Sequence, residues 1–155
     1  MSSKGQPVLD TIWVSESVSP EIKILISSFF ELADSKDPEA GRQLATSVFA
    51  KDAVFVSASG TFQGYQEISK CRDGAWNLVE SRQHRVQKAF FSTTDGLELC
   101  LLASVKIEFK NGNLIESPFA CHVQLEMTGS EEGSLRIRYL QVFADTAPLR
   151  AAAAS

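Results

Sequence analysis

The stretch from Leu97 to Asn113, LELCLLASVKIEFKNGN, decides the fold of this chain. Every second residue in it from Leu99 to Phe109 is apolar. This alternation predicts a long β-strand with one buried face, because successive side chains of a strand point to opposite sides. The segment Lys110-Asn-Gly-Asn at its end is a strong hairpin signal. We therefore expect an antiparallel strand to follow directly.

Three further runs around this stretch also have strand character. They span 82–92, 114–128 and 134–145, and turn signals at Asp95-Gly96 and from Gly129 to Gly133 separate them. Four long strands joined by short turns predict an antiparallel meander.

The N-terminal half has helical signals instead. A first helix starts at Ser19-Pro20-Glu21, with Ser19 as N-cap, and its apolar positions recur at helical spacing: Ile22, Leu25, Ile26, Phe29, Leu32 and Ala33. Asp37-Pro38-Glu39 starts a shorter helix, and a third is predicted from about Tyr65 to Ser81. Short strands are expected at 52–59 and 61–62. Helices followed by a meander indicate an α+β domain, in which a cone-shaped, curved antiparallel sheet wraps around three N-terminal helices.

We expect three segments along the chain: an N-terminal arm over 1–18, a cone domain over 19–147 and a flexible tail over 148–155. The arm contains Trp13 in a small apolar cluster. Because exposure of such a ring is costly, the arm is expected to dock on the body or on a second subunit.

Composition excludes several classes of function. The 155 residues are 44% hydrophobic and 22% charged, which is typical of a globular domain, and the net charge of −4 comes without a basic stripe for nucleic acid. The three cysteines form no C-x-x-C pair, which favours reduced thiols in the cytoplasm. No stretch is typical of a signal peptide or a membrane span, so we expect no membrane partner and a cytoplasmic location.

The order of these elements, and several segments within them, resemble the nuclear-transport-factor-2-like superfamily and its SnoaL-like branch. The likeness covers about 19–147, and within it the segments 72–84 and 139–145 resemble small SnoaL-like proteins of filamentous fungi in particular. The segments that carry it are 29–34 (FFELAD), 49–56 (FAKDAVFV), 62–68 (FQGYQEI), 72–76 (RDGAW), 81–84 (SRQH) and 139–145 (YLQVFAD).

The resemblance implies a cone whose open end admits a small apolar molecule, and often a homodimer through the outer face of the sheet. Relatives in fungal biosynthetic clusters, which serve secondary metabolism, are cofactor-free isomerases or cyclases. The same scaffold also carries dehydratases, hydrolases and non-enzymatic binders, so the fold alone does not assign the activity.

Sorting each strand into two faces gives a short list of polar groups inside the cone. His84, Tyr139 and Gln141 fall on the apolar faces, together with Cys121 and Ser117. A few polar groups in an apolar enclosure are typical of a small-molecule site. A β-bulge would reverse part of a face.

His84 is the first candidate for catalysis, because a histidine gives and takes protons near neutral pH. Tyr139 can donate a hydrogen bond to a developing enolate. Asp34, near the end of the first helix, can orient His84 or act as a base. Each also has a purely structural reading: a hydrogen-bonded core histidine, a packed tyrosine and a solvated helix end.

The remaining candidates are assigned to ligand binding. Phe30 lies one helical turn before Asp34, and Arg72 and Trp76 are four residues apart, so they either line the pocket or form a cation–π pair. Cys121 and Gln141 complete the inner list. His122 falls on the opposite face and ranks below His84, unless the strand register is inverted. We expect no metal and no cofactor, because the sequence has neither a His/Cys cluster nor a nucleotide-binding glycine motif.

Three hypotheses follow. The first is a cofactor-independent isomerase or cyclase, which should have a pocket with at least two convergent polar groups. A non-catalytic binder of an apolar metabolite should have a pocket lined only by apolar side chains. A dimeric interaction protein should have its cone filled by side chains.

Overall fold

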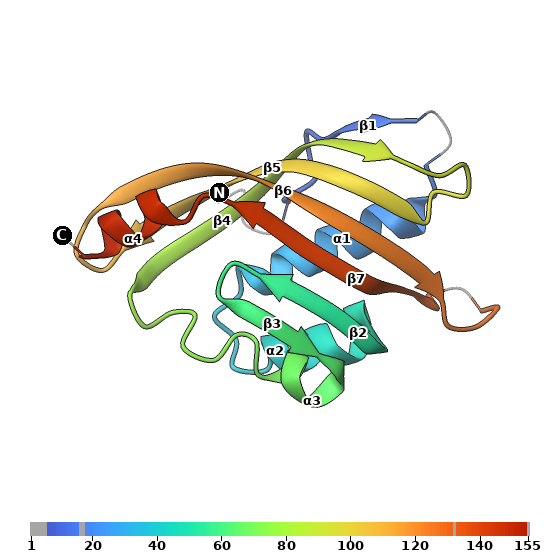
Figure 1. Ribbon diagram of the computed structural model, residues 1–155, viewed down its shortest axis with the longest axis horizontal. Helices are drawn as coiled ribbons and strands as arrows, with labels where there is room; N and C mark the ends of the chain where they lie inside the picture. The colour runs from blue at the N-terminus through green and yellow to red at the C-terminus, as the bar shows by residue number, and fades with distance from the viewer. Residues whose placement is uncertain (1–5, 16–17, 132, 155) are drawn as a thin grey trace.

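A single curved sheet of seven strands organises the chain, in the order β1-β4-β5-β6-β7-β2-β3 (Figure 1). The computed structural model describes residues 6–15, 18–131 and 133–154. Its elements, in chain order, are β1 (Ile12–Val14), α1 (Pro20–Ala33), α2 (Ala40–Gln43), the π-helical turn η1 (Leu44–Val48), β2 (Phe49–Ser57), β3 (Gly60–Gln63), α3 (Gly64–Ser69), β4 (Val79–Phe91), β5 (Glu98–Phe109), β6 (Leu114–Met127), β7 (Leu135–Ala144) and α4 (Ala147–Ala154).

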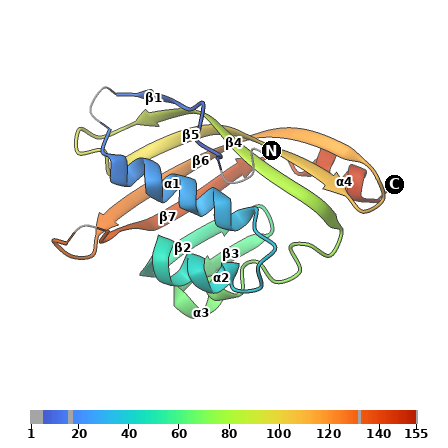
Figure 2. The same ribbon diagram turned by 180° about the vertical axis from the view of Figure 1, so that it is seen from behind.

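The sheet is curved but not closed, and α1 lies across its concave side (Figure 2). The meander from β4 to β7 is antiparallel, as the four runs predict. Two further pairings at the sides of the meander are parallel, β1 with β4 and β2 with β7. The α+β cone is confirmed, and one of its ends is left open between α1 and the strands.

Helix α1 forms as its sequence predicts. The Ser19 side chain accepts a hydrogen bond from the backbone N–H of Glu21 at 3.2 Å, and Pro20 occupies the first turn. The buried face carries two phenylalanines whose rings meet edge to face, Phe29 and Phe30, with centroids 4.9 Å apart. Phe29 also contacts Phe55 of β2 at 5.6 Å. These rings join the helix to the sheet and form one wall of the cone.

Two bulges reverse the faces of the first and last strands of the meander, β4 and β7. In β4 the register shifts between Val86 and Lys88, so Ala89 is buried while Phe90 is exposed. Simple alternation from His84 predicts that Lys88 and Phe90 lie inside the cone, and the bulge shows that this prediction is wrong. The register of β7 against β6 also shifts, and Arg138 has no partner in the pairing. Beyond it, Leu140 is buried in place of the predicted Tyr139.

The predicted third helix is much shorter than expected. It ends at Ser69, and turns connect it to β4. Gly74 adopts a φ of 75°, a left-handed conformation that cannot continue a right-handed helix. Val79 then enters the sheet, and Leu78 is exposed rather than buried.

The C-terminal segment forms a helix where the sequence predicts a flexible tail. Leu149, Ala152 and Ala153 of α4 pack against a small cluster at the ends of β4 and β5 (Val79, Val105, Ile107 and Phe109). The side-chain amides of Asn111 and Asn113 each donate to the carbonyl of Ala152 at 2.9 Å. These bonds satisfy a carbonyl at the helix end, which has no partner within the helix.

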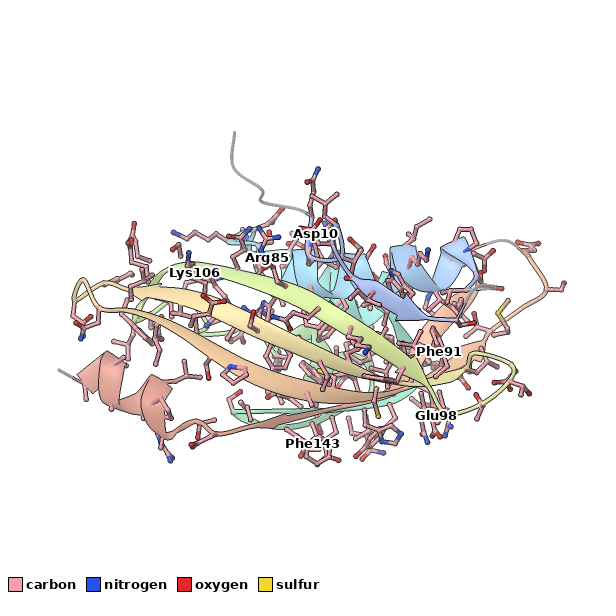
Figure 3. All side chains as sticks on the ribbon, turned by 90° about the horizontal axis from the view of Figure 1, so that it is seen from above. Asp10, Arg85, Phe91, Glu98, Lys106 and Phe143 are labelled. Carbon is pink, nitrogen blue, oxygen red and sulfur yellow. The ribbon has the colours of Figure 1, made fainter. Side chains whose placement is uncertain are left out.

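The N-terminal arm docks on the body. The carbonyl of Pro7 accepts from the backbone N–H of Val86 at 2.9 Å, and β1 extends this contact along β4. Asp10 and Arg85 lie beside each other where the arm crosses the strand (Figure 3), with Nη1 of Arg85 3.7 Å from Oδ2 of Asp10. Over the described residues, no helix is both long and apolar enough to cross a membrane.

Candidate functional site

A pocket of about 240 Å³ opens between the C-terminal half of α1 and strands β2 and β4–β7. Its walls are mainly apolar: Phe29, Phe30, Phe55, Val105, Ile107, Phe119, Val142 and Leu149. The polar side chains in the lining are few and of two kinds, hydroxyl groups (Ser57, Ser59, Ser117) and nitrogen bases or cations (Arg72, Arg82, His84). Apolar walls with a few polar groups are the usual composition of a small-molecule site.

Asp34 and His84 form a hydrogen-bonded pair at the edge of this pocket. Asp34 caps the end of α1, which aims its carboxylate at β4. One carboxylate oxygen lies 2.5 Å from Nδ1 of the His84 ring, and the other accepts the backbone N–H of His84 at 2.8 Å. Because the carboxylate occupies Nδ1, the Nε2 atom is the ring nitrogen left to exchange a proton with a ligand.

Aromatic rings enclose the imidazole of His84. The ring of Phe30 lies 5.2 Å from it, and that of Phe119 meets it edge-on at 5.5 Å. Only 16% of the His84 side chain and 10% of the Asp34 side chain are exposed. The pair therefore works in a largely dry setting, where its electrostatic contact is stronger than in water.

Two arginines reach the same pocket from different segments. Arg72, in the turns after α3, donates from Nη2 to the carbonyl of Ala33. Arg82, on β4, donates from Nη2 to the carbonyl of Ala75 at 3.2 Å. Burial lowers the pKa of Arg72 from its ordinary value, and it lowers that of Arg82 to about 10, so that Arg82 remains a cation at neutral pH.

Trp76 does not line this pocket. Its indole N–H donates to the carbonyl of Ser35 at 3.0 Å, and Arg82 stacks on its ring at 5.0 Å. The predicted pairing of Trp76 with Arg72 depended on a continuous helix, but α3 ends at Ser69, before either residue. Trp76 instead packs against Arg82, whereas Arg72 lines the pocket independently of Trp76.

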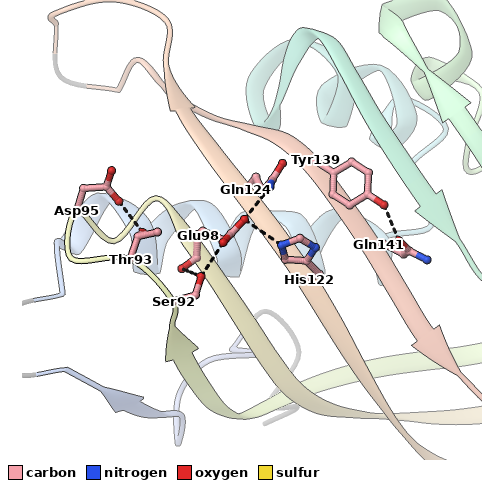
Figure 4. A network of polar contacts seen from close by, with 8 residues as sticks. All are labelled: Ser92, Thr93, Asp95, Glu98, His122, Gln124, Tyr139 and Gln141. Atoms are coloured by element: carbon pink, nitrogen blue, oxygen red, sulfur yellow. Dashed lines mark hydrogen bonds and ion pairs between the residues drawn. The ribbon is translucent and has the colours of Figure 1, made fainter.

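Three predicted site residues lie on the outer face of the sheet, away from α1 (Figure 4). The Tyr139 hydroxyl donates to the side chain of Gln141 at 2.5 Å. His122 lies 3.2 Å from a carboxylate oxygen of Glu98. The prediction that Tyr139 and Gln141 face the pocket is wrong, because the bulge at Arg138 turns both outward. His122 is also on the outer face, as its alternation indicates, and it is not among the residues that line the pocket.

Glu98 is the centre of this outer cluster. Hydrogen bonds from Gln124, Ser92 and His122, in decreasing order of effect, lower the pKa of its carboxyl to about 2. Gln124 donates at 2.6 Å and Ser92 at 2.8 Å. The carboxylate is thus held ionised on the outer surface.

Cys121 faces inward but is packed in the core rather than exposed to the pocket. Burial raises the pKa of its thiol to about 12, so the reactive thiolate is scarce at neutral pH. Ser117, from the same strand, is the β6 polar side chain that does reach the pocket lining.

No protein-family model matches the chain, and no curated protein matches it either. Solved structures do match its fold. A hypothetical protein with a ketosteroid isomerase-like fold from Catenulispora acidiphila, in complex with trimethylamine, is 21% identical over 88% of this chain and 94% of its own, with a TM-score of 0.66. A protein from Burkholderia pseudomallei described as NTF2-like, of unknown function, is 15% identical over 89% of this chain and 100% of its own, with a TM-score of 0.67.

The chain has the nuclear-transport-factor-2-like fold. Another structural match is a hexachlorocyclohexane dehydrochlorinase, LinA type 2, which is 15% identical over 81% of this chain and 83% of its own, with a TM-score of 0.61. TerC, co-crystallised with polyporic acid, is 13% identical over 88% of this chain and 100% of its own, with a TM-score of 0.64. The likeness to the fungal SnoaL-like branch stays a prediction.

A second, larger hollow of about 670 Å³ lies elsewhere on this nuclear-transport-factor-2-like chain, along the other side of α1. Its lining includes Glu21, Glu31 and Arg136, and also Ile24, which is 65% exposed. It is a wide surface depression that contains neither His84 nor Asp34, so we place the site in the smaller pocket.

The sequence reasoning missed Arg82 and Phe119 as site residues. Arg82 stands two residues before His84 on a strand, so the alternation that places His84 inside also places Arg82 there. Phe119 was on the predicted inner face, but its contact with the ring of His84 joins β6 to β4, which are separated by β5. Only the curvature of this fold brings the two rings together.

Proposed function

We propose that the chain is a cofactor-independent isomerase or cyclase that moves a proton on a small, largely apolar substrate. The observation that carries this proposal is the pair of Asp34 and His84 at the edge of an apolar pocket. A base held in a fixed orientation beside an enclosed apolar space is what proton abstraction next to a carbonyl requires.

In the proposed reaction, Nε2 of His84 takes a proton from a carbon next to the substrate carbonyl. The electron pair of that C–H bond moves into the carbonyl to form an enolate, and the imidazolium is stabilised by the Asp34 carboxylate. Return of the proton to a different carbon completes an isomerisation. In a cyclisation, the enolate carbon attacks a second carbonyl carbon of the same molecule, and the oxygen of that carbonyl takes the proton back from the imidazolium. Tyr139 takes no part, because it lies on the outer face.

The pocket also supports this function over its two alternatives. A plain binder would be lined only by apolar side chains, whereas Arg72, Arg82 and His84 converge here. In an interaction protein the cone would be filled, whereas a cavity of about 240 Å³ is present. Among the proteins of this fold, the matched dehydrochlorinase is an enzyme that removes hydrogen chloride from its substrate, a reaction that includes loss of a proton.

Deuterium exchange tests the proton transfer without knowledge of the natural substrate. Small planar ketones with acidic C–H groups, such as 2-tetralone and 2-indanone, are incubated with the protein in D₂O, and proton NMR follows loss of the signal next to the carbonyl. The protein should accelerate exchange over buffer. His84→Gln should lower this acceleration by about 10²–10⁴-fold, which is the usual contribution of one general base.

His122→Gln is the matched control, because it alters the other histidine of the chain on the opposite face of the sheet. This variant should accelerate deuterium exchange in the ketones as much as the unaltered protein does. Equal rates for His84→Gln and the unaltered protein, or no acceleration with either ketone, would favour the non-catalytic binder.

We also propose that the chain forms a homodimer through the outer face of the sheet. Phe143, which is 53% exposed, lies on this face (Figure 3). Leu102 is also exposed, and both residues are register partners of Ala120. Sedimentation equilibrium should give twice the mass of the chain, and Phe143→Lys should shift it toward the monomer. A monomer at all concentrations would remove this proposal.

A further inference from the structure

The pocket holds two guanidinium groups whose hydrogen-bonding capacity is incompletely used. Among the described residues, Nε of Arg72 and Nη1 of Arg82 are buried and have no hydrogen-bond partner. The other contacts of each side chain are with main-chain carbonyls, Ala33 for Arg72 and Ala75 for Arg82. Neither guanidinium has a hydrogen-bonded carboxylate partner among these contacts, which is unusual because a buried charge is generally paired.

The charges around the pocket are also unbalanced. Its lining contains Arg72 and Arg82 but no aspartate or glutamate. Asp34 is the carboxylate whose charge acts on both arginines, and it is already engaged twice by His84. Two guanidinium cations therefore share the charge of a single carboxylate, and the positive charge of Arg72 contributes to lowering the pKa of Arg82. An added negative charge would be favourable here.

The rest of the pocket determines the body of the ligand. Phe29, Phe55 and Phe119 line it together with aliphatic side chains. Such walls favour a planar apolar group, because aromatic faces offer large contact areas without polar atoms.

We propose that Arg72 and Arg82 bind an anionic oxygen group of the ligand, a carboxylate or an ionised enol or phenol, on a planar apolar body. The assignment rests on the proposed function, since it names the ligand class of the same pocket. The guanidinium groups of Arg72 and Arg82, which both line the pocket, would donate to the anionic oxygen, and this would place the ligand's ring between the phenylalanines. In an enolisation, the same donors would stabilise the negative charge that develops on the enolate oxygen. This is the role that the sequence predicted for Tyr139.

Isothermal titration calorimetry with a matched pair of probes tests this inference. 2-Naphthoate carries a carboxylate on a planar apolar ring, and 2-naphthamide has nearly the same shape without the charge. The unaltered protein should bind 2-naphthoate at least about tenfold more tightly than 2-naphthamide, because charge-assisted hydrogen bonds are the stronger ones. Equal affinities, or no binding of 2-naphthoate, would overturn the inference without recourse to any variant.

Variants then assign the effect to residues. Arg72→Gln and Arg82→Gln should each reduce the preference for 2-naphthoate and leave the affinity for 2-naphthamide nearly unchanged, with thermal unfolding measured to confirm that each variant folds. Arg85→Gln is the matched control, because Arg85 is on the same strand outside the pocket and pairs with Asp10 (Figure 3). A preference that survives both pocket variants would contradict the assignment.

His84→Gln separates this inference from the proposed function. It should abolish ketone exchange but keep the preference for 2-naphthoate. A protein that prefers 2-naphthoate but does not exchange ketones would be an anion binder, and the catalytic proposal alone would fail. Exchange without any preference for 2-naphthoate would leave the catalytic proposal standing and remove the role of the arginines.

Discussion

The carboxylate of Asp34 holds His84 at two points, with one oxygen on the imidazole ring at 2.5 Å and the other on the backbone N–H at 2.8 Å. Such a two-point contact fixes both the ring and the strand that carries it. It also directs Nδ1 away from the pocket, so that the chemistry is left to Nε2.

Asp34→Asn should therefore lower ketone exchange by about 10²-fold or more, since the neutral amide no longer stabilises the imidazolium. Nitrogen NMR of the His84 ring should show a proton on Nδ1 in the unaltered protein and a mixture of tautomers in the variant. Glu31→Gln, which alters an exposed carboxylate of the same helix bonded to Ser27, should change neither result. Unchanged exchange in Asp34→Asn would mean that the pair is only structural.

The stack of Arg82 on Trp76 should contribute to stability. Trp76→Leu removes both the stacking and the bond from the indole N–H to Ser35. The free energy of unfolding, measured with urea, should fall by about 1–3 kcal/mol. In a double-mutant cycle with Arg82→Met, the two changes should be non-additive by about 0.5–2 kcal/mol. Strict additivity would show that the two side chains do not stabilise each other.

The outer cluster predicts an acid-dependent loss of stability. Hydrogen bonds from Gln124, Ser92 and His122 lower the pKa of Glu98 from 4.5 to about 2 in the folded chain. The folded state therefore binds the proton less readily than the unfolded state, and the stabilisation is present above the unfolded pKa and lost as the pH falls from 4.5 through about 2.

Urea unfolding of the unaltered protein and of Glu98→Gln should thus differ most near neutral pH and converge in acid. Gln124→Leu removes the donor with the largest effect, so it should raise the pKa of Glu98 in the folded state. In that background the stabilisation from Glu98 should be lost over a narrower pH range below 4.5. A constant difference between Glu98→Gln and the unaltered protein at every pH would contradict this account.

The three cysteines should react at very different rates. Cys100 is exposed, whereas burial raises the pKa of Cys71 to about 11 and that of Cys121 to about 12. Because the thiolate is the reactive form, iodoacetamide should modify one site rapidly in the folded protein and the other two after unfolding. Mass spectrometry of peptides should place the rapid reaction at Cys100, and Cys100→Ser should lack it. Rapid labelling of Cys121 would show that the core opens.

Local patterns were sufficient to predict much of the fold and part of the site. Ser19 and Pro20 start α1 where expected, and the alternation from Leu99 to Phe109 is buried as predicted. His84 precedes the bulge of β4, so its face follows from simple alternation. Asp34 is at the helix end that the apolar spacing marks, and the two meet because α1 crosses the concave side of the sheet.

The errors come from single residues that local patterns do not reveal. An unpaired Arg138 reverses the face of Tyr139 and Gln141, although nothing in the composition of β7 marks a bulge. Gly74 divides the expected third helix through a left-handed backbone conformation. The helix at the C-terminus depends on contacts with Asn111 and Asn113, which are distant in sequence.

The bond from the backbone of His84 to Asp34 has a consequence beyond the pocket, since it occupies a donor on the side of β4 that faces away from β5. Along the same side, Pro7 takes the N–H of Val86, and β1 pairs with the last part of the strand. An unprotected strand border recruits other chains into aggregates. Loss of the Asp34 carboxylate should therefore weaken resistance to self-association as well as proton transfer.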